Sequence, residues 1–540
     1  MKTKIKAAAA AALLAVAGCD YVSIGNSGGG GGSAGSPPPE IAAAELQSAA
    51  RDERVRRFYE ARQWRAAWGA EAQQALIGAL RESGRHGLDP RRFLGPVEAA
   101  TAPAAKEAAL TLAALDLAEI LARGQTDPSR LFEVYTLPRP EANVVTGLAQ
   151  AAEQGNAPQW LAGLAPQDEE YRALSEAYVR YSEAASREPP AAVSAGDSIN
   201  VGDRDPRIPA IVQSLRTQGY LAAQAAAQPQ AQPPQQGKAA PKAAPAADAT
   251  RYTPEIEAAV KRVQTDYGIN PDGVIGGGTL EIVNATARDR ARQLAVNLER
   301  RRWLPREAPT TRIDVNTAAA FLEYWREGQL ANTRRVMVGQ PGWETPALLS
   351  PMTRLVANPP WNVPDSIEEE ELSQRSAAYL AANNFERRNG RLVQAPGPQS
   401  ALGLVKMDMD NPHAIYLHDT PSKPGFARAE RHVSHGCVRV QDAVGFAAML
   451  AEHDGKRDQF ERALARRDPQ DAGQAVEGAV QLSRPIPVRL LYHSVYRDPN
   501  GGRLLFRSDP YGWDETVAQA LGLAARQRAV ARRHSGDIGP

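Results

Sequence analysis

Residues 416–442 bring together side chains that could carry out nucleophilic chemistry. Their sequence, YLHDTPSKPGFARAERHVSHGCVRVQD, holds three of the chain's eight histidines and one of its two cysteines. A thiol attacks a carbonyl carbon as the thiolate, yet a free cysteine with a pKa of about 8.5 is mostly protonated near neutral pH. Cys437 therefore needs a base within hydrogen-bond reach, and His418, His432 and His435 are the candidates.

Strand and turn patterns narrow the choice of base. The alternation in IYLHD predicts a strand with Tyr416 and His418 on one face, so His418 could project into the same cleft as Cys437. His435 lies in the tight turn SHGC, where its backbone N–H matters more than its ring. Gly436 allows close backbone approach, and consecutive N–H groups around Gly436 and Cys437 would stabilise an oxyanion.

A metal site is the other use that clustered histidines could have. His413, His418, His432 and His435 lie close together in the sequence. Their spacings do not put two histidines on one helix, no glutamate stands in an HExxH arrangement, and structural zinc usually takes more thiols. We therefore expect no metal and no other cofactor, and we expect His432, in the basic run FARAERH, to be a surface or flap residue.

The chain is long enough for several domains that could position this segment. It has 540 residues, 43% of them hydrophobic and 23% charged, which indicates globular domains joined by linkers. The formal net charge of +1 argues against nucleic acid as a partner. Helical periodicity predicts an all-α region at 42–190, in which His86 is a helix-end or surface residue. From Leu294 onward, short β-favouring runs predict a mainly β domain with helical inserts at 365–385 and 441–454.

The N-terminus has the features of an export signal. A basic start is followed by an apolar run at 7–17, too short to span a bilayer, and then by VAGC, which resembles the lipobox of bacterial lipoproteins. The resemblance implies that residues 1–18 are a signal peptide and that Cys19 is lipidated; an ordinary secretory signal is the alternative. Residues 19–41, rich in Gly, Ser and Pro, would then tether a periplasmic protein to the inner or outer membrane, with Cys437 as its remaining thiol.

Residues 203–286 form a second predicted unit. An Ala/Pro/Gln tract at 222–247 interrupts it, and we expect this tract to be a disordered insertion. The second half resembles the three-helix peptidoglycan-binding domain, in Gln264 after an apolar helix face, in the DGVIGGGT turn at 272–279 and in Asn284. The alternative is a small structural helix bundle that has no affinity for the wall.

The thiol and histidine pattern also resembles a known enzyme family. His418, an interval of 15 residues and then SHGC with VRV are similar to the signature of the L,D-transpeptidase catalytic domain. The flanking words NLERRRWLP, NPPWNVP, YLAANNF, PGPQSALG and DPYGWD resemble the large branch of that family, which combines a scaffold region, a peptidoglycan-binding domain and the catalytic domain. The resemblance implies a multidomain α+β fold: an all-α scaffold at 42–190, a small three-helix domain at 203–286, a mainly β, sandwich-like catalytic domain with helical inserts at 290–518, and a C-terminal helix or tail at 519–540.

The resemblance also implies a role for each residue of the motif. Cys437 is the implied nucleophile and His418 its base, and the backbone carbonyl of Asp419 orients the imidazole. Arg439 either binds a substrate carboxylate or braces the loop. The implied oxyanion and backbone supports are Gly436, His435 and Asp419, and the implied substrate-binding candidates are Tyr416, Ser434 and Arg439.

The implied reaction joins the third residues of peptidoglycan stem peptides. Cys437 attacks the amide between the diamino acid and D-Ala of a tetrapeptide donor, D-Ala leaves, and the side-chain amine of a neighbouring stem attacks the thioester. Carbapenem-type β-lactams are the implied covalent inhibitors. An L,D-carboxypeptidase or D-amino-acid exchange enzyme with the same site, and a non-catalytic wall-binding lipoprotein, remain as alternatives. The acceptor stays open between another stem, a free D-amino acid and a lysine of an outer-membrane lipoprotein.

Overall fold

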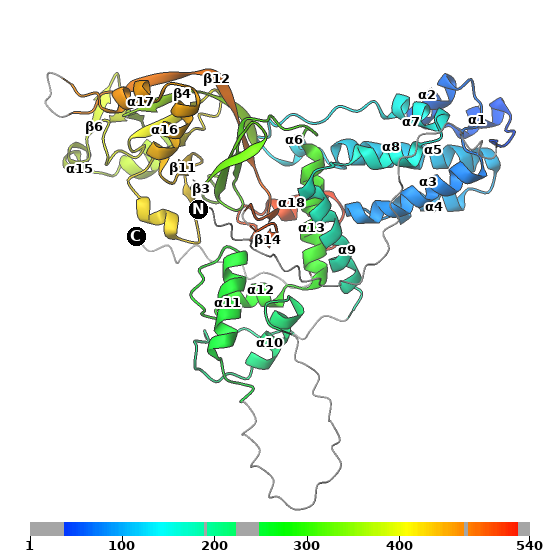
Figure 1. Ribbon diagram of the computed structural model, residues 1–540, viewed down its shortest axis with the longest axis horizontal. Coiled ribbons are helices and arrows are strands. Elements are labelled where there is room, and N and C mark those ends of the chain that lie inside the picture. The colour runs from blue at the N-terminus through cyan, green and yellow to red at the C-terminus, as the bar shows by residue number, and fades with distance from the viewer. Residues whose placement is uncertain (1–36, 188–191, 223–247, 469–473, 500, 527–540) are drawn as a thin grey trace, which may run out of the picture.

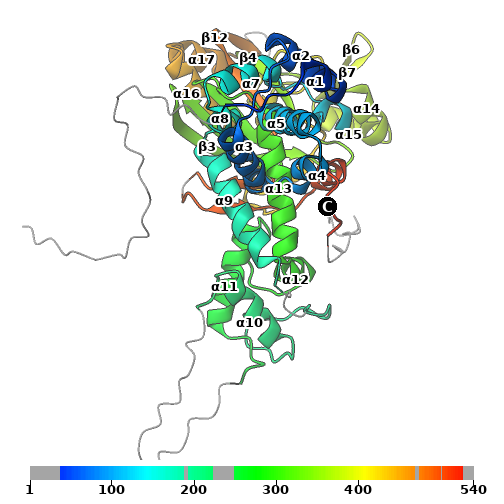
Figure 2. The ribbon, with the colours of Figure 1, turned by 90° about the vertical axis from the view of Figure 1, so that its right-hand side faces the viewer.

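The computed structural model describes residues 37–187, 192–222, 248–468, 474–499 and 501–526 as a multidomain α+β protein (Figure 1). A helical lobe, a small three-helix unit and a β-rich lobe surround one long helix, α13 (Ala287–Trp303). In the view turned by 90°, α13 runs beside α9 (Glu169–Ala184) (Figure 2). This arrangement confirms the predicted fold class, with its all-α, three-helix and mainly β parts.

The helical lobe is built around α5 (Pro103–Arg123). Proline in its first turn and Gly124 after its end bound this Ala- and Leu-rich helix. The helix is buried on nearly all sides, and even Glu107 is covered, its carboxylate accepting hydrogen bonds from the amides of Ala67 and Trp68. The other helices of this lobe besides α9 are α1 (Ala43–Ala49), α2 (Glu53–Ala61), α3 (Ala70–Glu82), α4 (Arg91–Ala99), α6 (Pro128–Leu131), α7 (Val144–Glu153) and α8 (Ala157–Leu164).

The three-helix unit is held together at its Asp-Gly turn. Gln264 is buried, and its amide donates to Asp272 Oδ1 at 3.0 Å and accepts from the Gly273 N–H at 2.9 Å. These bonds tie the end of one helix to the turn before the next, and they need the glutamine and the Asp-Gly pair at this spacing. The helices are α10 (Ile208–Thr217), α11 (Pro254–Asp266) and α12 (Gly277–Asn284).

Helix α13 connects the three parts, and because of it the first strand begins later than predicted. The strand pattern expected from Leu294 onward begins later, because the helix runs to Trp303 and the first strand starts at Arg312. The helix begins with a capping box, in which the side chains of Thr286 and Asp289 bond to each other's backbone amides. It is buried on most of its sides, so apolar residues do not mark a single face and the helical periodicity is hidden.

The β-rich lobe is, among the described residues, a nine-stranded mixed sheet in the order β10-β3-β11-β9-β8-β4-β12-β1-β2. Strand β3 pairs with β2 along its first half and with β11 and β10 along its second half, so the sheet closes on itself. The domain predicted to be sandwich-like is therefore a curved sheet that closes on itself. Its strands are β1 (Arg312–Asn316), β2 (Phe321–Arg326), β3 (Gln329–Gly339), β4 (Leu348–Ala357), β8 (Val405–Met409), β9 (Leu417–His418), β10 (His432–Ser434), β11 (Val438–Val440) and β12 (Gly478–Leu491).

Two groups of helices decorate the sheet. Helices α16 (Ala443–His453) and α17 (Arg457–Leu464) pack their buried phenylalanines, Phe446 and Phe460, into the core beneath it. The insert at residues 361–394, here called the lid, has a small apolar core of its own that includes Ile367 and Leu392. Its elements are β5 (Trp361–Asn362), α14 (Asp365–Ile367), a π turn (Glu368–Leu372), α15 (Ala377–Ala382), β6 (Phe385–Arg388) and β7 (Arg391–Gln394).

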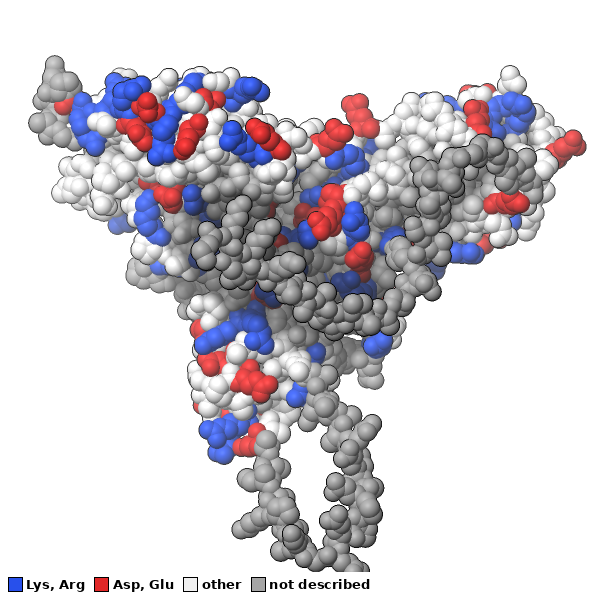
Figure 3. Space-filling view, viewed as in Figure 1, with Lys and Arg blue, Asp and Glu red and all other residues white. Residues whose placement is uncertain are grey.

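The last described residues include a hairpin of β13 (Val495–Arg497) and β14 (Leu504–Phe506), followed by α18 (Trp513–Ala520). Helix α18 therefore starts before the predicted C-terminal segment 519–540, because Gly512 ends the preceding turn and the helix forms directly after it. Acidic and basic side chains are intermixed on the face drawn in Figure 3. No helix in the described ranges is both long enough and apolar enough to cross a membrane.

Several predictions concern residues that the structure does not describe. The signal peptide 1–18, the lipidation site Cys19 and most of the tether 19–41 lie outside the described residues. So does the predicted insertion 222–247 apart from its first residue. These four expectations stay predictions.

Candidate active site

Polar side chains line one face of the sheet across β8, β9 and β11. Strand pairing puts Lys406, His418 and Arg439 in one row. Because side chains alternate along a strand, Tyr416 and Cys437 form the next row on the same face, while the intervening residues point into the core. Adjacent strands lie about 4.8 Å apart, so His418 and Cys437 are diagonal neighbours.

His418 is oriented by a backbone carbonyl. Its side chain is buried, and its Nδ1 lies 2.5 Å from the carbonyl oxygen of Asp419. A carbonyl only accepts, so Nδ1 carries the proton and Nε2 is left as a base. Burial, helped by the nearby charge of Arg439, lowers the pKa of His418 to about 3, and the ring is therefore neutral near pH 7.

The carboxylate of Asp419 does not touch the imidazole. It accepts a hydrogen bond from the Leu404 N–H at 3.0 Å and pairs with the ammonium group of Lys423. Gly403 has a φ of +57°, and a Cβ atom there would come within 2.4 Å of this carboxylate. The Asp419 side chain thus holds the loop before β8, and its backbone oxygen contacts the ring.

Cys437 is half-buried at the start of β11. Its thiol donates to the carbonyl oxygen of Ala414, with Sγ and O 3.6 Å apart. Burial raises the pKa of Cys437 above its ordinary value, although hydrogen bonding with Tyr416 and the charges of Lys406 and Arg439 oppose that rise. The resting pair is therefore a thiol and a neutral imidazole.

The SHGC turn is held by hydroxyl groups. Ser434 Oγ donates to the Cys437 carbonyl at 2.6 Å and accepts from the Gly436 N–H at 3.3 Å. Thr345 Oγ1 donates to the Gly436 carbonyl at 2.8 Å. The φ of Gly436 is +104°, a conformation that favours glycine. Among the described residues, no hydrogen-bond partner is found for the backbone N–H groups of His435 and Cys437.

Tyr511 supports this turn from the C-terminal segment. Its hydroxyl donates to the Gly339 carbonyl at 2.6 Å and accepts from the Thr345 N–H at 3.4 Å. The Gly339 N–H in turn donates to Thr345 Oγ1 at 2.8 Å. A Cβ atom at Gly339 would stand 1.9 Å from the Trp343 carbonyl oxygen, so the backbone approach requires glycine. A chain of hydrogen bonds thus runs from Tyr511 to Gly436.

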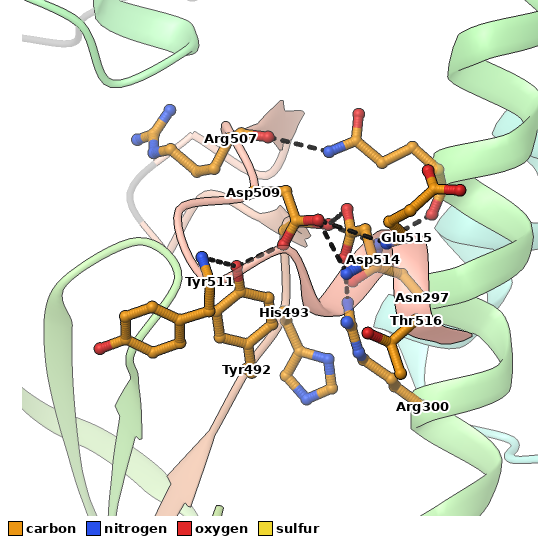
Figure 4. Close-up of polar contacts among 12 residues, drawn as sticks. Asn297, Arg300, Tyr492, His493, Arg507, Asp509, Tyr511, Asp514, Glu515 and Thr516 are labelled. Carbon is orange, nitrogen blue, oxygen red and sulfur yellow. Dashed lines mark hydrogen bonds and ion pairs between the residues drawn. The ribbon is translucent and has the colours of Figure 1, made fainter. Parts of the chain in front are cut away.

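The same chain continues to helix α13 (Figure 4). The Tyr511 N–H donates to Tyr492 Oη at 3.3 Å, and the Tyr492 hydroxyl donates to Asp509 Oδ1 at 2.6 Å. Asp509 Oδ2 accepts from the Asp514 N–H at 2.9 Å, and Asp514 pairs with Arg300 of α13. Burial and the charge of Asp514 raise the pKa of Asp509 to about 6. The segment DPYGWD, residues 509–514, therefore connects the nine-stranded sheet to helix α13.

Two cations and a tyrosine flank Cys437. The side chain of Lys406 lies over the Tyr416 ring, with its Nζ 4.4 Å from the ring centroid, and the Tyr416 and His418 rings lie 5.5 Å apart. Burial and Cys437 raise the pKa of Tyr416. Within the described part of the chain, the buried Nε of Arg439 has no hydrogen-bond partner, and Cys437 and Glu371 are the groups whose charges favour its protonated form. Arg439 is thus a partly buried cation beside the thiol with an unused donor at Nε.

The other histidines have structural contacts. His435 Nε2 lies 2.8 Å from Glu371 Oε1 of the lid, and its ring packs edge-on against Trp343. His432 Nε2 lies 2.9 Å from the Thr317 carbonyl oxygen, so His432 closes the flap with a buried ring and is not on the surface. No cluster of three or more potential ligands for a metal ion is found among the described residues.

Some residues of this site were missed in the sequence. Lys406 could have been found, because alternation in LVKMDM places it on one face of its strand. Thr345, Glu371 and Tyr511 carry no local signal of their own, since they approach the turn from distant parts of the chain. Long-range contacts of this kind have no periodicity to reveal them.

Comparison with known families identifies three domains. A family described as the L,D-transpeptidase catalytic domain matches residues 310–458. The family of the scaffold domain matches 53–177. A family described as "Putative peptidoglycan binding domain" matches 238–283. The order of the three matches is the order inferred from the sequence.

Each individual relative matches only part of this chain. A Haemophilus influenzae protein named "Putative L,D-transpeptidase" is 30% identical over 249 residues, which cover 42% of this chain and 48% of that protein. The chain thus spans about half the length of the curated relative it matches. The crystal structure of an L,D-transpeptidase from Stackebrandtia nassauensis is 13% identical, with a TM-score of 0.22, covering 56% of this chain and 97% of that chain. The catalytic domain of an Enterococcus faecium L,D-transpeptidase acylated by ertapenem is also 13% identical, with a TM-score of 0.19, covering 34% of this chain and 99% of that chain. By its family matches, the chain is similar to a scaffold domain, a peptidoglycan-binding domain and an L,D-transpeptidase catalytic domain, in that order.

Proposed function

We propose that this protein is a peptidoglycan L,D-transpeptidase that forms crosslinks between the third residues of stem peptides. The observation that carries the proposal is the diagonal pair of Cys437 and His418 on one sheet face, with Nδ1 of the imidazole held by a backbone carbonyl. A neutral imidazole with a free Nε2 is a general base for a protonated thiol. Catalytic hydrogen bonds often tighten only when substrate binds, so we infer that the thiol turns from Ala414 towards His418 in the substrate complex.

In the proposed acylation step, a proton passes from the Cys437 thiol through His418 to the departing D-Ala. His418 Nε2 takes the thiol proton while the sulfur attacks the carbonyl carbon between the diamino acid and D-Ala. The imidazolium then gives that proton to the leaving nitrogen, D-Ala departs, and a thioester remains on Cys437. Because the Gly436 N–H is already bonded to Ser434, we assign the oxyanion to the Cys437 N–H and to the neighbouring His435 N–H.

The second step transfers the acyl group to an amine. The side-chain amine of a second stem attacks the thioester, the thiol is released, and the new amide joins two third residues. Water competes for the same thioester. The lid supports transfer over hydrolysis in this proposal, because Glu371 of the lid contacts His435 beside the nucleophile and can limit access of water.

Intact-protein mass spectrometry with a tetrapeptide donor tests the proposal. We expect the protein mass to rise by the donor minus D-Ala, which identifies the thioester. A carbapenem-type β-lactam should add covalently at the same cysteine. An unchanged mass with both reagents would instead favour the non-catalytic wall-binding alternative.

The products separate transfer from hydrolysis. The L,D-carboxypeptidase alternative uses the same acyl-enzyme, and a D-amino-acid exchange enzyme differs only in its acceptor. Mass analysis of peptidoglycan fragments should reveal dimers joined through third residues, whereas dimer-free tripeptides would refute crosslinking.

The peptidoglycan-acting domains favour a periplasmic, wall-associated location for the protein. Lipidation at Cys19 and anchoring in either membrane are part of the proposal and can be tested by labelling with a radioactive fatty acid.

Replacing Asp419 by asparagine should have a small effect on acylation. The variant keeps the backbone carbonyl that contacts His418 and loses the charge that pairs with Lys423. We expect the acylation rate to fall by less than about tenfold, well below the loss expected for a catalytic acid or base. Stopped-flow acylation by a carbapenem measures it. Lys423→Met, which breaks the same ion pair, is the matched control, and a loss in Asp419→Asn as large as that in a His418 variant would make the carboxylate a triad member.

Replacing Arg439 by glutamine should weaken donor binding. We assign the guanidinium to a carboxylate of the stem peptide, because its buried Nε has no hydrogen-bond partner among the described residues. A lost charge-assisted bond should raise the donor KM by about tenfold to a hundredfold with little change in kcat. Arg457→Gln is the control, since Arg457 lies on α17 and pairs with Glu452 and Glu461. A lower melting temperature with an unchanged KM would instead indicate a bracing role.

A further inference from the structure

A cleft separates the peptidoglycan-binding unit from the flap of the catalytic lobe. The flap is the segment Asp419–Val433, which leads from His418 to the SHGC turn. The cleft has a volume of about 500 Å³, within the size range of ligand sites, and lies outside the catalytic face. One wall is the turn Gly268–Asn270 after α11, and the other is the part of the flap at Ala427–Glu430. In Figure 1 the flap lies above α11.

The wall from the peptidoglycan-binding unit is held firmly on the catalytic lobe. Arg503 pairs with Asp266 at the end of α11, and Arg507 donates to the Asp266 carbonyl oxygen. The rings of Tyr267 and Phe506 stack with centroids 6.0 Å apart. Because Tyr267 immediately precedes the turn at Gly268–Asn270, these contacts set the position of the turn against the catalytic lobe.

A half-buried arginine, Arg431, holds the flap wall. Arg431 Nη2 donates to the carbonyl oxygens of Ala319 and Ala320 at 3.2 Å, and its Nη1 donates to the Arg428 carbonyl at 2.8 Å. Burial and neighbouring cations lower the pKa of Arg431 to about 10. The next residue, His432, starts β10, which leads into the SHGC turn. The cleft wall and the nucleophile are therefore parts of one continuous, well-supported segment.

The cleft is lined by apolar, polar and charged residues. Ile269 gives it a half-buried apolar patch, and Asn270 presents an exposed side-chain amide. On the flap side, Arg428 is exposed. The carboxylate of Glu430 is already engaged, because its Oε1 accepts from the His432 N–H at 2.9 Å and lies 2.6 Å from the ring Nδ1 of the same residue. A ligand suited to these walls has amide and hydroxyl groups together with a carboxylate for Arg428.

We propose that this cleft binds a segment of the peptidoglycan polymer next to the donor stem, namely a disaccharide with its own stem peptide. The inference rests on the proposed function and adds a second subsite to it. A polymer held by both walls would present its neighbouring stem to Cys437 at a high effective concentration. A soluble tetrapeptide is too short to occupy both places and would gain nothing from the cleft.

The test compares two donors in variants that fill the cleft. Asn270→Trp and Ala427→Trp add bulk at exposed positions, one on each wall. D-Ala release is measured from isolated sacculi and from a soluble tetrapeptide, using the full chain. We expect each variant to lose about tenfold or more in rate on sacculi and to keep its rate on the soluble tetrapeptide. Ala44→Trp, at an exposed position on α1 in the helical lobe, is the matched control and should change neither rate.

The outcomes distinguish the subsite from the function. Equal rates for wild type and cleft variants on sacculi would overturn the subsite, and so would equal losses on both donors. A wild-type protein that releases no D-Ala from either donor would overturn the proposed function and the subsite with it. Co-sedimentation of Cys437→Ala with sacculi adds a readout that does not need turnover. Adding Asn270→Trp to that variant should reduce the bound fraction.

Discussion

Cys437→Ser is expected to abolish formation of the acyl-enzyme. Serine has nearly the shape of cysteine, but its hydroxyl stays protonated and is a far weaker nucleophile in a site built for a thiol. We expect D-Ala release to fall by at least about a thousandfold. Intact-protein mass spectrometry should detect no adduct with the tetrapeptide donor or with a carbapenem.

The fold should survive this change. The Cys437 side chain is half-buried and donates a long bond to the Ala414 carbonyl oxygen, which a hydroxyl can replace. Its melting temperature and its binding to sacculi should match those of the wild type, so that lost activity cannot be assigned to unfolding. A persistent adduct on Cys437→Ser would place the nucleophile elsewhere and refute the proposed mechanism.

His418→Ala is expected to lower the acylation rate at pH 7 by about a hundredfold to ten-thousandfold, the range for loss of a general base. It should also change how the rate depends on pH. In the wild type, the pKa of His418 is about 3 and that of Cys437 is raised, so a neutral imidazole and a thiol coexist across the neutral range. The wild-type rate should therefore be nearly flat from about pH 5 to pH 8, because the base is unprotonated throughout.

The variant should lose that plateau. Without the imidazole, attack depends on the small fraction of free thiolate, which rises about tenfold for each pH unit below the thiol pKa. Its rate should rise with pH in the same proportion, a slope that a merely structural role would not produce. His435→Ala is the matched control, since it removes the other histidine of the motif and should keep the flat profile. A wild-type rate that climbs through pH 6 to 7 would instead indicate an imidazole that titrates there, and would contradict a neutral resting pair.

Local patterns were sufficient to predict the fold class. Alternation along IYLHD places Tyr416 and His418 on one face, and the structure has both there. The Gln264 and Asp-Gly spacing also had a local physical cause, because the hydrogen bonds that require it lie within ten residues. The prediction that strands begin at Leu294 was wrong, because the pattern there depends on the rest of the protein. That helix is surrounded by other parts of the protein, so burial removed the one-sided apolar pattern on which the prediction depended.

The sequence by itself determined which residues could react and in what order the domains stand, because residue type, spacing and alternation are local properties. Only the tertiary structure decided the resting state of the pair, since burial and the charge of Arg439 act through space on His418 and Cys437. It likewise decided that Gly436 has its N–H occupied and that Tyr511 and Thr345 support the turn. It also decided that the end of α11, just before the turn at Gly268–Asn270, is bonded to Arg503 and Arg507 far along the chain. Contacts between segments far apart in the chain leave no trace in local pattern, and in this protein they are what shape the site.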